Sequence, residues 1–329
     1  MPSSSISLKA SSAAALVALD MQQVDRVIER RLASDVALIN QIANYIISAG
    51  GKRIRPMLVL LFSGALGFNG PEKHELAATV EFIHTATLLH DDVVDESALR
   101  RGRETANALF GNAASVLVGD FVYSRAFQMM VSVNSMRVLE VLAEATNVIA
   151  EGEVLQLMNM HDPNLRVEDY LRVIRFKTAK LFEASARLGA VLAQAGPEVE
   201  ESCAAYGRSL GTAFQLVDDL LDYEGSTTEL GKNVGDDLRE GKPTLPLLIA
   251  MERATGEQRE MMRHSIEHGE VERLSDIVHI VRSTGALAAT RDAARAEADK
   301  AGRSLGVLAP SAYREALLEL CVRSVDRSS

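Results

Sequence analysis

The chain has 329 residues, with 45 acidic against 35 basic side chains, which gives a formal charge of −10. This negative balance argues against binding to nucleic acid, whose phosphates attract basic surfaces. Hydrophobic residues make up 47% of the chain, enough for a large core, although tryptophan is absent.

The N-terminal segment is rich in serine and has no regular apolar spacing. A short apolar run from Ala13 to Leu19 resembles a weak signal peptide, but it has no convincing cleavage site and leads directly into Asp20. We therefore expect residues 1–16 to form a flexible tail and residues 17–329 to form a single domain.

The rest of the sequence has helical periodicity almost throughout. Apolar residues between Leu32 and Ile47 recur at intervals near 3.6 residues, and Gly50 and Gly51 supply a C-terminal cap. Strand alternation and fixed-period repeats are not evident. The pattern predicts an all-α fold, with further helices at 54–67, 72–98, 112–130, 136–159, 167–195, 199–223, 243–253, 256–268, 272–285, 286–304 and 310–326.

The polar, glycine-rich segment from Tyr223 to Lys242 interrupts this pattern. A loop of that length inside a compact domain is usually functional. Cys203 and Cys321 lie far apart without metal-ligand spacing, which indicates inert thiols in a reducing cytoplasm. No apolar stretch approaches the about 20 residues needed to cross a bilayer.

Two aspartate clusters carry the strongest chemical signal. Asp91, Asp92 and Asp95 lie close together, and on a helix Asp91 and Asp95 would share one face. Such carboxylates repel one another unless cations lie among them. Mg²⁺ suits them because it binds one or two carboxylates and completes its octahedron with water and substrate phosphates.

A single cluster of this kind is most often a solvated helix face, but the sequence contains a second one. Asp218, Asp219 and Asp222 repeat the same spacing inside the apolar stretch from Phe214 to Leu221. A solvated face would not have Phe, Leu and Val around it. We expect the two helices to face each other and to hold several Mg²⁺ ions against a diphosphate.

Basic residues accompany the acidic clusters in a fixed order. Lys52 and Arg55 stand at an expected helix start, where backbone N–H groups also attract phosphate. Any one of these cations could be an ordinary surface charge, but the ordered set indicates binding of an anion. The others are Arg100, Arg101, Lys177, Lys232 and Lys242.

In order, these motifs are Gly-Lys-Arg-x-Arg-Pro, Glu-x-x-His, His-Asp-Asp-x-x-Asp, Leu-Arg-Arg-Gly, Lys-Thr, Phe-Gln-x-x-Asp-Asp-x-x-Asp and Gly-Lys-x-x-Gly-x-Asp-x-x-Glu-Gly-Lys. From about residue 35 to its end, the chain resembles the all-trans polyprenyl diphosphate synthases. The stretches 81–120 and 207–248 are similar to bacterial octaprenyl diphosphate synthases. The resemblance implies one large helical bundle with a central cavity, a homodimer and a role in making the ubiquinone side chain.

The resemblance also implies roles for individual residues. Both aspartate clusters would hold Mg²⁺ on an allylic diphosphate. Isopentenyl diphosphate would be bound by Lys52, Arg55, His84 and Arg101, although His84 alone would more often be a core histidine. Direct ligands of the allylic diphosphate would be Arg100, Lys177, Thr178, Gln215, Lys232 and Lys242.

The expected reaction extends an allylic diphosphate, with farnesyl diphosphate as the expected starter, by repeated condensation with isopentenyl diphosphate. The expected product has eight or nine isoprene units, with a geranylgeranyl or farnesyl product as the alternative. Ala86, five residues before Asp91, is small where short-chain members of the family have a bulky aromatic residue. Phe82, Met130 and Leu142 are the other expected tunnel residues.

Three other classes of protein fit the sequence less well. A terpene cyclase would have a different second metal motif and would not need Lys52, Arg55 or Arg101. A di-iron bundle needs two Glu-x-x-His motifs, and only the one from Glu81 to His84 is found. A non-catalytic subunit of a heteromeric synthase would usually lack one aspartate cluster.

Overall fold

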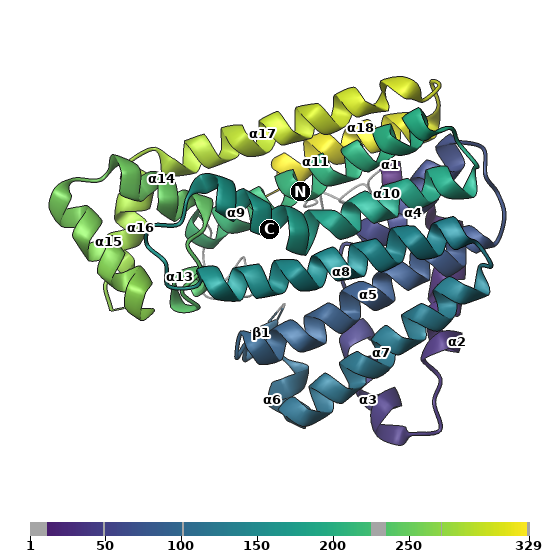
Figure 1. Ribbon diagram of the computed structural model, residues 1–329, viewed down its shortest axis with the longest axis horizontal. Coiled ribbons are helices and arrows are strands. Elements are labelled where there is room, and N and C mark those ends of the chain that lie inside the picture. The colour runs from purple at the N-terminus through teal and green to yellow at the C-terminus, as the bar shows by residue number, and fades with distance from the viewer. Residues whose placement is uncertain (1–11, 49, 101, 225–234, 271, 328–329) are drawn as a thin grey trace, which may run out of the picture.

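The computed structural model describes residues 12–327, except 49, 101, 225–234 and 271. Long helices run side by side along the molecule, and shorter ones cover one end (Figure 1). This confirms the all-α expectation. The helices are α1 (Ser12–Leu16), α2 (Ala18–Leu32), α3 (Ala37–Ser48), α4 (Ile54–Ala65), α5 (Glu72–Val94), α6 (Ala106–Phe110), α7 (Asn112–Ser132), α8 (Met136–Asn159), α9 (Val167–Ile174), α10 (Lys180–Leu192), α11 (Pro197–Glu224), α13 (Asp236–Arg239), α14 (Leu245–Arg253), α15 (Gly256–His268), α16 (Leu274–Ser283), α17 (Ala286–Ser304) and α18 (Ala312–Val325).

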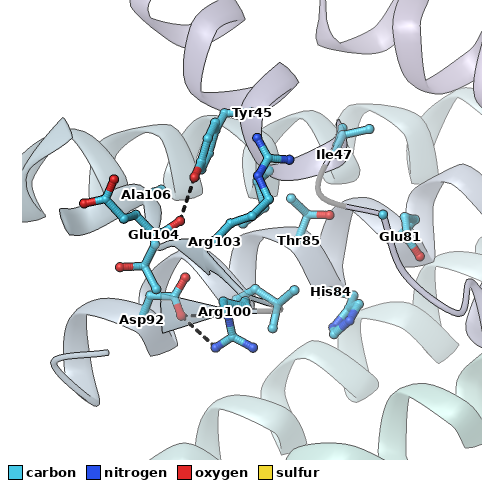
Figure 2. Close-up of a pocket in the computed structure, with 14 residues that line it drawn as sticks. Tyr45, Ile47, Glu81, His84, Thr85, Asp92, Arg100, Arg103, Glu104 and Ala106 are labelled. Atoms are coloured by element: carbon cyan, nitrogen blue, oxygen red, sulfur yellow. Dashed lines mark hydrogen bonds and ion pairs between the residues drawn. The ribbon is translucent and has the colours of Figure 1, made fainter. Parts of the chain in front are cut away.

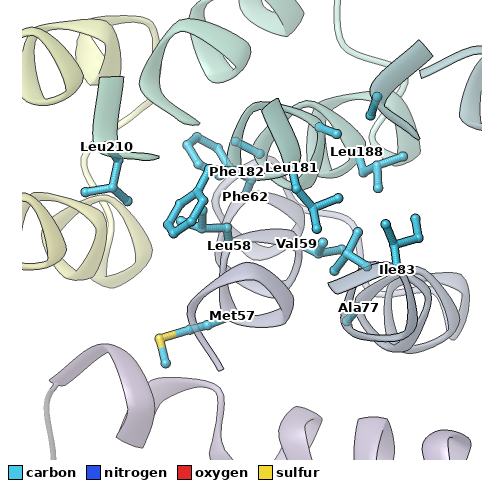
Figure 3. Packing of buried hydrophobic residues seen from close by; sticks show 14 of the residues in the cluster. Met57, Leu58, Val59, Phe62, Ala77, Ile83, Leu181, Phe182, Leu188 and Leu210 are labelled. Atoms are coloured by element: carbon cyan, nitrogen blue, oxygen red, sulfur yellow. The ribbon is translucent and has the colours of Figure 1, made fainter. Parts of the chain in front are cut away.

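The core lies where α4, α5, α10 and α11 pack against one another. Every residue of α4 from Pro56 to Ser63 is buried, as expected for a helix that is apolar all round. Phe62 packs edge-on against Tyr206, and Figure 3 shows Phe62, Leu58 and Phe182 in this cluster. A second, smaller core joins α14, α15 and α16 to α17.

Glycine lets α10 and α11 approach closely. A Cβ atom at Gly207 would lie 2.3 Å from the Phe182 carbonyl oxygen, and one at Gly211 would lie 2.7 Å from the Ala179 Cα. Contacts this short leave room for hydrogen only. The two helices therefore form a tightly packed wall, and it carries Phe182 and Phe214.

The structure corrects several expected boundaries. The helix expected at 72–98 ends at Val94, and a small antiparallel hairpin follows, formed by β1 (Leu99–Arg100) and β2 (Arg103–Glu104). The periodic stretch from Leu32 to Ile47 belongs to two helices, because residues 33–36 separate α2 from α3. Of the expected 1–16 tail, the structure describes residues 12–16, which form the helix α1, and Ala13 is buried.

The helix expected at 167–195 contains a wide turn. Residues Arg175–Ala179 form a π-helix, η1, between α9 and α10. Gly152 of α8 lies against this turn, and a Cβ atom at Gly152 would be 2.6 Å from the backbone nitrogen of Lys177. A short 3₁₀ turn, η2 (Leu305–Val307), joins α17 to α18. Among the described residues, no helix is long and apolar enough to cross a membrane.

Candidate active site

A cavity of about 660 Å³ opens among α4, α5, α8, η1, α11 and the α13–α14 segment. Its lining combines charged groups with apolar side chains such as Leu88, Val173 and Ile174. Most of the expected site residues line it, although they come from segments far apart in the sequence. They are Lys52, Arg55, His84, Asp91, Asp95, Arg100, Lys177, Thr178, Gln215, Asp218, Asp219 and Lys242.

Asp91 and Asp95 stand at the C-terminal end of α5, as the i, i+4 spacing predicts. Each faces a lysine from another part of the chain. The Lys242 ammonium lies 2.9 Å from Asp95 Oδ2 and 2.6 Å from Glu240, and Lys177 lies 3.8 Å from Asp91 Oδ2. These lysines hold positive charge against the first aspartate cluster.

Asp92 points away from the main cavity. Its Oδ1 accepts a 2.7 Å hydrogen bond from Arg100 Nε and lies 2.7 Å from Arg100 Nη2 in an ion pair, in the smaller pocket shown in Figure 2. Its Oδ2 is buried and has no hydrogen-bond partner among the described residues. Asp92 therefore fixes Arg100, which lines both cavities.

The second aspartate cluster lies on α11. Asp218 and Asp219 line the cavity, whereas Asp222 is fully buried and accepts a 3.3 Å hydrogen bond from the Asp237 backbone N–H. Asp219 accepts hydrogen bonds from the Tyr170 hydroxyl and, at 2.8 Å, from Gln215 Nε2. Of the six expected metal ligands, four face the main cavity and two are held behind it.

Burial changes the acidity of the carboxyl groups here. Desolvation, with the charge of Asp237, raises the pKa of Asp219 to about 7. Desolvation also raises the pKa of Glu153 to about 7, although Lys177 opposes the shift, and it raises the pKa of Asp91. Carboxyl groups with raised pKa values in a cavity are typical of sites where a bound cation completes the charge balance.

The wide turn η1 presents two polar residues to the cavity. Lys177 donates a 2.5 Å hydrogen bond to Glu153 Oε2, and the Thr178 hydroxyl donates at 2.9 Å to Gln215 Oε1. Gln215 in turn bonds Asp219. A chain of hydrogen bonds thus joins η1 to the second aspartate cluster.

Cations and aromatic rings form the wall nearest the start of α4. Arg55 lies 4.6 Å from the centroid of the Phe182 ring, and Lys52 lies 5.8 Å from that of Phe214. Arg327, near the C-terminus, lies 3.8 Å from the same Phe214 ring. Burial lowers the pKa of the Arg327 guanidinium from its ordinary value. This wall carries positive charge on an apolar support.

The donor set fits a hard divalent cation. Carboxylate oxygens are the ligands that such ions prefer, and Asp91, Asp95, Asp218 and Asp219 present them to one cavity. In the part of the chain that the structure describes, no three His, Cys, Asp or Glu side chains already converge on one point. A metal here would need further ligands from a bound substrate.

Several expected residues lie outside this cavity. Arg101 and Lys232 fall outside the described residues. The four expected tunnel residues are buried in the main core and are not among the residues that line the cavity. They are Phe82, Ala86, Met130 and Leu142. Their role in chain length stays a prediction.

Sequence reasoning missed three residues that the fold brings into the cavity, namely Glu153, Tyr170 and Arg327. Glu153 lies directly after Gly152 and about one turn before Gln156. This short polar pattern on an otherwise apolar helix was the only sequence signal for a site residue there. Arg327 follows the last helix and had no sequence signal, because only packing of α18 brings it to the site.

Glu81 of the single Glu-x-x-His motif lies 3.4 Å from Arg53, so it forms an ion pair.

Comparison with known proteins agrees with this geometry. The family model "Polyprenyl synthetase" matches residues 36–282. The chain is 58% identical to octaprenyl diphosphate synthase of Escherichia coli K12, with 95% of this chain and 97% of that protein aligned. It is 45% identical to an all-trans-nonaprenyl-diphosphate synthase (geranyl-diphosphate specific) of Rhodobacter capsulatus, over 94% and 96% of the two chains.

Solved structures give the same result. A Caulobacter crescentus polyprenyl synthase complexed with calcium and isoprenyl diphosphate superposes with a TM-score of 0.94 at 47% identity, covering 98% of this chain and 100% of that one. A decaprenyl diphosphate synthase from Rhodobacter capsulatus gives 0.91 at 46% identity, over 96% and 98%. Matches in sequence and fold extend over nearly the whole chain, and the chain therefore belongs to the polyprenyl synthetase family.

Proposed function

We propose that the protein is a cytoplasmic prenyltransferase that makes a long-chain all-trans polyprenyl diphosphate from an allylic diphosphate and isopentenyl diphosphate. The observation that carries this proposal is the cavity itself. It places two carboxylate clusters opposite two separate groups of cations, with apolar side chains between them. The cations match the two diphosphates, the carboxylates match metal ions bound to a diphosphate, and the apolar side chains match a hydrocarbon tail.

The cations near α5 and η1 would bind the allylic diphosphate. Arg100, held by Asp92, and Lys177 would stabilise the negative charge that develops on this group as its C–O bond breaks. The double bond of isopentenyl diphosphate, held by Lys52, Arg55 and His84, then attacks the allylic carbon. This attack leaves a cation at C3 of the isopentenyl unit, and C2 then loses a proton to the released diphosphate, which forms the new double bond.

Apolar residues would protect the reaction from water. Leu88, Val173, Ile174, Phe182 and Phe214 line the cavity beside the charged groups. Water would trap an allylic cation, so a cavity that excludes it favours condensation over hydrolysis. The hydrocarbon tails of both substrates would supply the remaining cover.

We propose Mg²⁺ as the metal. Asp91, Asp95, Asp218 and Asp219 are the residues placed to hold it, because they face the cavity, with Asp92 and Asp222 behind them. When bound, Mg²⁺ would neutralise the diphosphate and assist its departure. Lys177 lies against Asp91 and Lys242 lies against Asp95. With Mg²⁺ on these aspartates, both lysines would be available to bind the phosphate oxygens.

We propose a product of eight or nine isoprene units, made from farnesyl diphosphate and used for a ubiquinone side chain. The names of the relatives support this length, since they include octaprenyl and nonaprenyl diphosphate synthases. The small Ala86, five residues before Asp91, supports it too, because it places no bulky side chain in the path expected for the tail.

We further propose a homodimer. Large apolar side chains on the neighbouring helices α7 and α8 are exposed, among them Leu117, Val131, Leu157 and Met158. Exposed apolar groups gathered on adjacent elements are typical of an interface. Light scattering coupled to gel filtration would measure the assembly, and a monomer at micromolar concentration would contradict it.

One incubation tests the main proposal. Purified protein with Mg²⁺, farnesyl diphosphate and labelled isopentenyl diphosphate should give dephosphorylated products that chromatograph as octaprenol or nonaprenol. Omission of Mg²⁺ with added chelator should abolish the product. Products of 20 carbons or fewer would refute the long-chain assignment, and a cyclic hydrocarbon without label would indicate a cyclase.

A further inference from the structure

Tyr170 of α9 joins the wall of the active-site cavity to the second aspartate cluster. The residue is only 4% exposed, and it lines the cavity together with Val173 and Ile174 of the same helix. Its hydroxyl donates a hydrogen bond to Oδ2 of Asp219 on α11. A buried tyrosine hydroxyl needs a hydrogen-bond partner, but a backbone carbonyl would serve equally well. Here the partner is a carboxylate of the proposed metal site.

Asp219 is held on both of its oxygens by uncharged donors. Its Oδ2 accepts the hydrogen bond from Tyr170, and its Oδ1 accepts one from Gln215 Nε2 at 2.8 Å. Gln215 is itself oriented by the Thr178 hydroxyl, which donates to its Oε1 at 2.9 Å. Asp219 is buried, whereas nearly half of the neighbouring Asp218 side chain is exposed. The contacts of Asp219 therefore fix one carboxylate of the pair in a single orientation.

The donors at this cluster differ in charge from those at the first one. Lys177 faces Asp91 and Lys242 faces Asp95, so a metal ion at the first cluster must compete with two ammonium groups. A phenol hydroxyl is uncharged at neutral pH, so Tyr170 orients its carboxylate without opposing a cation. Loss of a partner that orients a metal ligand typically weakens metal binding by about 10- to 100-fold.

We propose that Tyr170 is a positioning residue for the metal ion at the second aspartate cluster, and that it acts through its hydrogen bond to Asp219. The proposal rests on the proposed prenyltransferase function. The other role open to Tyr170 is packing of α9 against the cavity wall. Packing depends on the aromatic ring, whereas positioning depends on the hydroxyl. A substitution that removes only the hydroxyl therefore separates the two roles.

The test compares Tyr170→Phe with Tyr206→Phe. Tyr206 is a matched control because it is buried, lies on the same helix as Asp219, and donates its hydroxyl to a backbone carbonyl, that of Leu317, at 2.7 Å. Both variants lose one buried hydroxyl, but only the first loses a contact with the aspartate cluster.

Two measurements report on the metal. Mg²⁺ is titrated calorimetrically into each protein in the presence of the thio analogue of farnesyl diphosphate, which ionises too slowly to react. The Mg²⁺ concentration that gives half-maximal turnover is measured with the natural substrates. For Tyr170→Phe we expect about 10- to 100-fold weaker Mg²⁺ binding and a matching rise in the Mg²⁺ requirement, with an unchanged KM for isopentenyl diphosphate. For Tyr206→Phe we expect wild-type Mg²⁺ values.

A double variant tests whether the effect passes through Asp219. In an Asp219→Asn background, the further change Tyr170→Phe should not weaken Mg²⁺ binding again. An equal further loss in that background would overturn the proposal. So would wild-type Mg²⁺ binding by the single Tyr170→Phe variant, and a lower melting temperature with that result would assign the hydroxyl to folding alone. If the wild-type protein binds Mg²⁺ but makes no prenyl product, the proposed function itself fails, which is a distinct result.

Discussion

Side chains in the cavity neutralise one another when no substrate is bound. Lys242 lies between Asp95 and Glu240, and Lys177 lies between Asp91 and Glu153. A metal–diphosphate complex would replace these internal pairs with ligand contacts. Single substitutions should therefore affect catalysis more strongly than they affect folding.

Removal of one cavity-facing aspartate tests the metal assignment. Asp91→Ala or Asp218→Ala should lower turnover by orders of magnitude, because each removes a carboxylate placed to hold Mg²⁺. The fold should persist, since the remaining carboxylates repel less. Steady-state rates at saturating Mg²⁺ and circular dichroism measure both effects. Asp169→Ala, in an exposed pair with Arg166, is the control. Turnover within a few-fold of wild type would contradict the assignment.

The raised pKa of Glu153 predicts a dependence of stability on pH. Its pKa rises from 4.5 to about 7, chiefly because of burial, so the folded protein binds this proton more tightly than the unfolded chain. The resulting stabilisation is complete below pH 4.5 and is lost as the pH rises through about 7. The contribution of Glu153 to the stability of the metal-free protein should therefore fall over this pH range, and the contribution of Asp219 should fall in the same direction.

Glu153→Gln should flatten part of that decline, because glutamine does not titrate. Differential scanning calorimetry at a series of pH values would measure it. Glu140→Gln is a matched control, since Glu140 lies on the same helix and pairs with Arg137 at the surface. Parallel curves for Glu153→Gln and the wild type would show that this carboxyl does not carry the proton.

At the scale of elements, the long helices were predictable and the short ones were not. Helical periodicity and cap residues located α4, α8 and α17 closely, since these signals are local. The β1–β2 hairpin and the π-helix η1 carry no periodic signal. The Asp92–Arg100 pair fixes the hairpin, and Gly152 of α8 packs against the backbone of η1. Both features therefore depend on contacts between distant segments.

The same distinction applies to the site. Residues inside compact motifs, such as Asp91 or Lys177, were identified from sequence because their neighbours form a pattern. Glu153 and Arg327 were missed because their partners, Lys177 and Phe214, belong to other helices. Packing alone also decides that Asp92 and Asp222 turn away from the cavity that Asp91 and Asp218 face.

The β1–β2 hairpin depends on Tyr45 of α3. The Tyr45 hydroxyl donates a 2.7 Å hydrogen bond to the Glu104 carbonyl oxygen, and Arg103 stacks on its ring, as Figure 2 shows. Strands of two residues are not stable by themselves. Because β1 carries Arg100, loss of this contact should loosen a residue that we propose to bind the allylic diphosphate.

Tyr45→Phe removes only the hydroxyl. One neutral hydrogen bond contributes about 1 kcal/mol, so we expect the allylic KM to rise by about two- to tenfold, with little change in the KM for isopentenyl diphosphate. Initial rates at varied concentrations of each substrate would measure this. Tyr123→Phe, on α7, serves as the control. An unchanged allylic KM would indicate that the Asp92–Arg100 pair alone fixes the hairpin.

At the scale of the whole molecule, the proposed tunnel takes the tail of the product into the core. A tail of eight units is on the order of 30 Å long, about the length of a 20-residue helix. Phe82 and Ala86 of α5, Met130 of α7 and Leu142 of α8 are all buried in the main core. Elongation on this path therefore requires these side chains to separate around the tail.

A ring at position 86 should block that path. Ala86→Phe is expected to shorten the products to about three or four units, while the first condensation stays fast because the metal site is untouched. Chromatography of dephosphorylated products would measure their length, with Ala86→Ser as a size-matched control. Mainly long products from Ala86→Phe would mean that the tail leaves the site by another route.

In the wide turn η1, the number of residues matters to the candidate site as much as their identity does. A π-helical turn holds one residue more than an α-helical turn, and each residue rotates a helix by about 100°. Deletion of any one residue from Arg175–Ala179 would restore a regular helix and turn α9 by that angle against α10. Tyr170 would then swing away from Asp219, although neither residue had been altered. A single-codon deletion in this turn should therefore be as harmful as the loss of an aspartate.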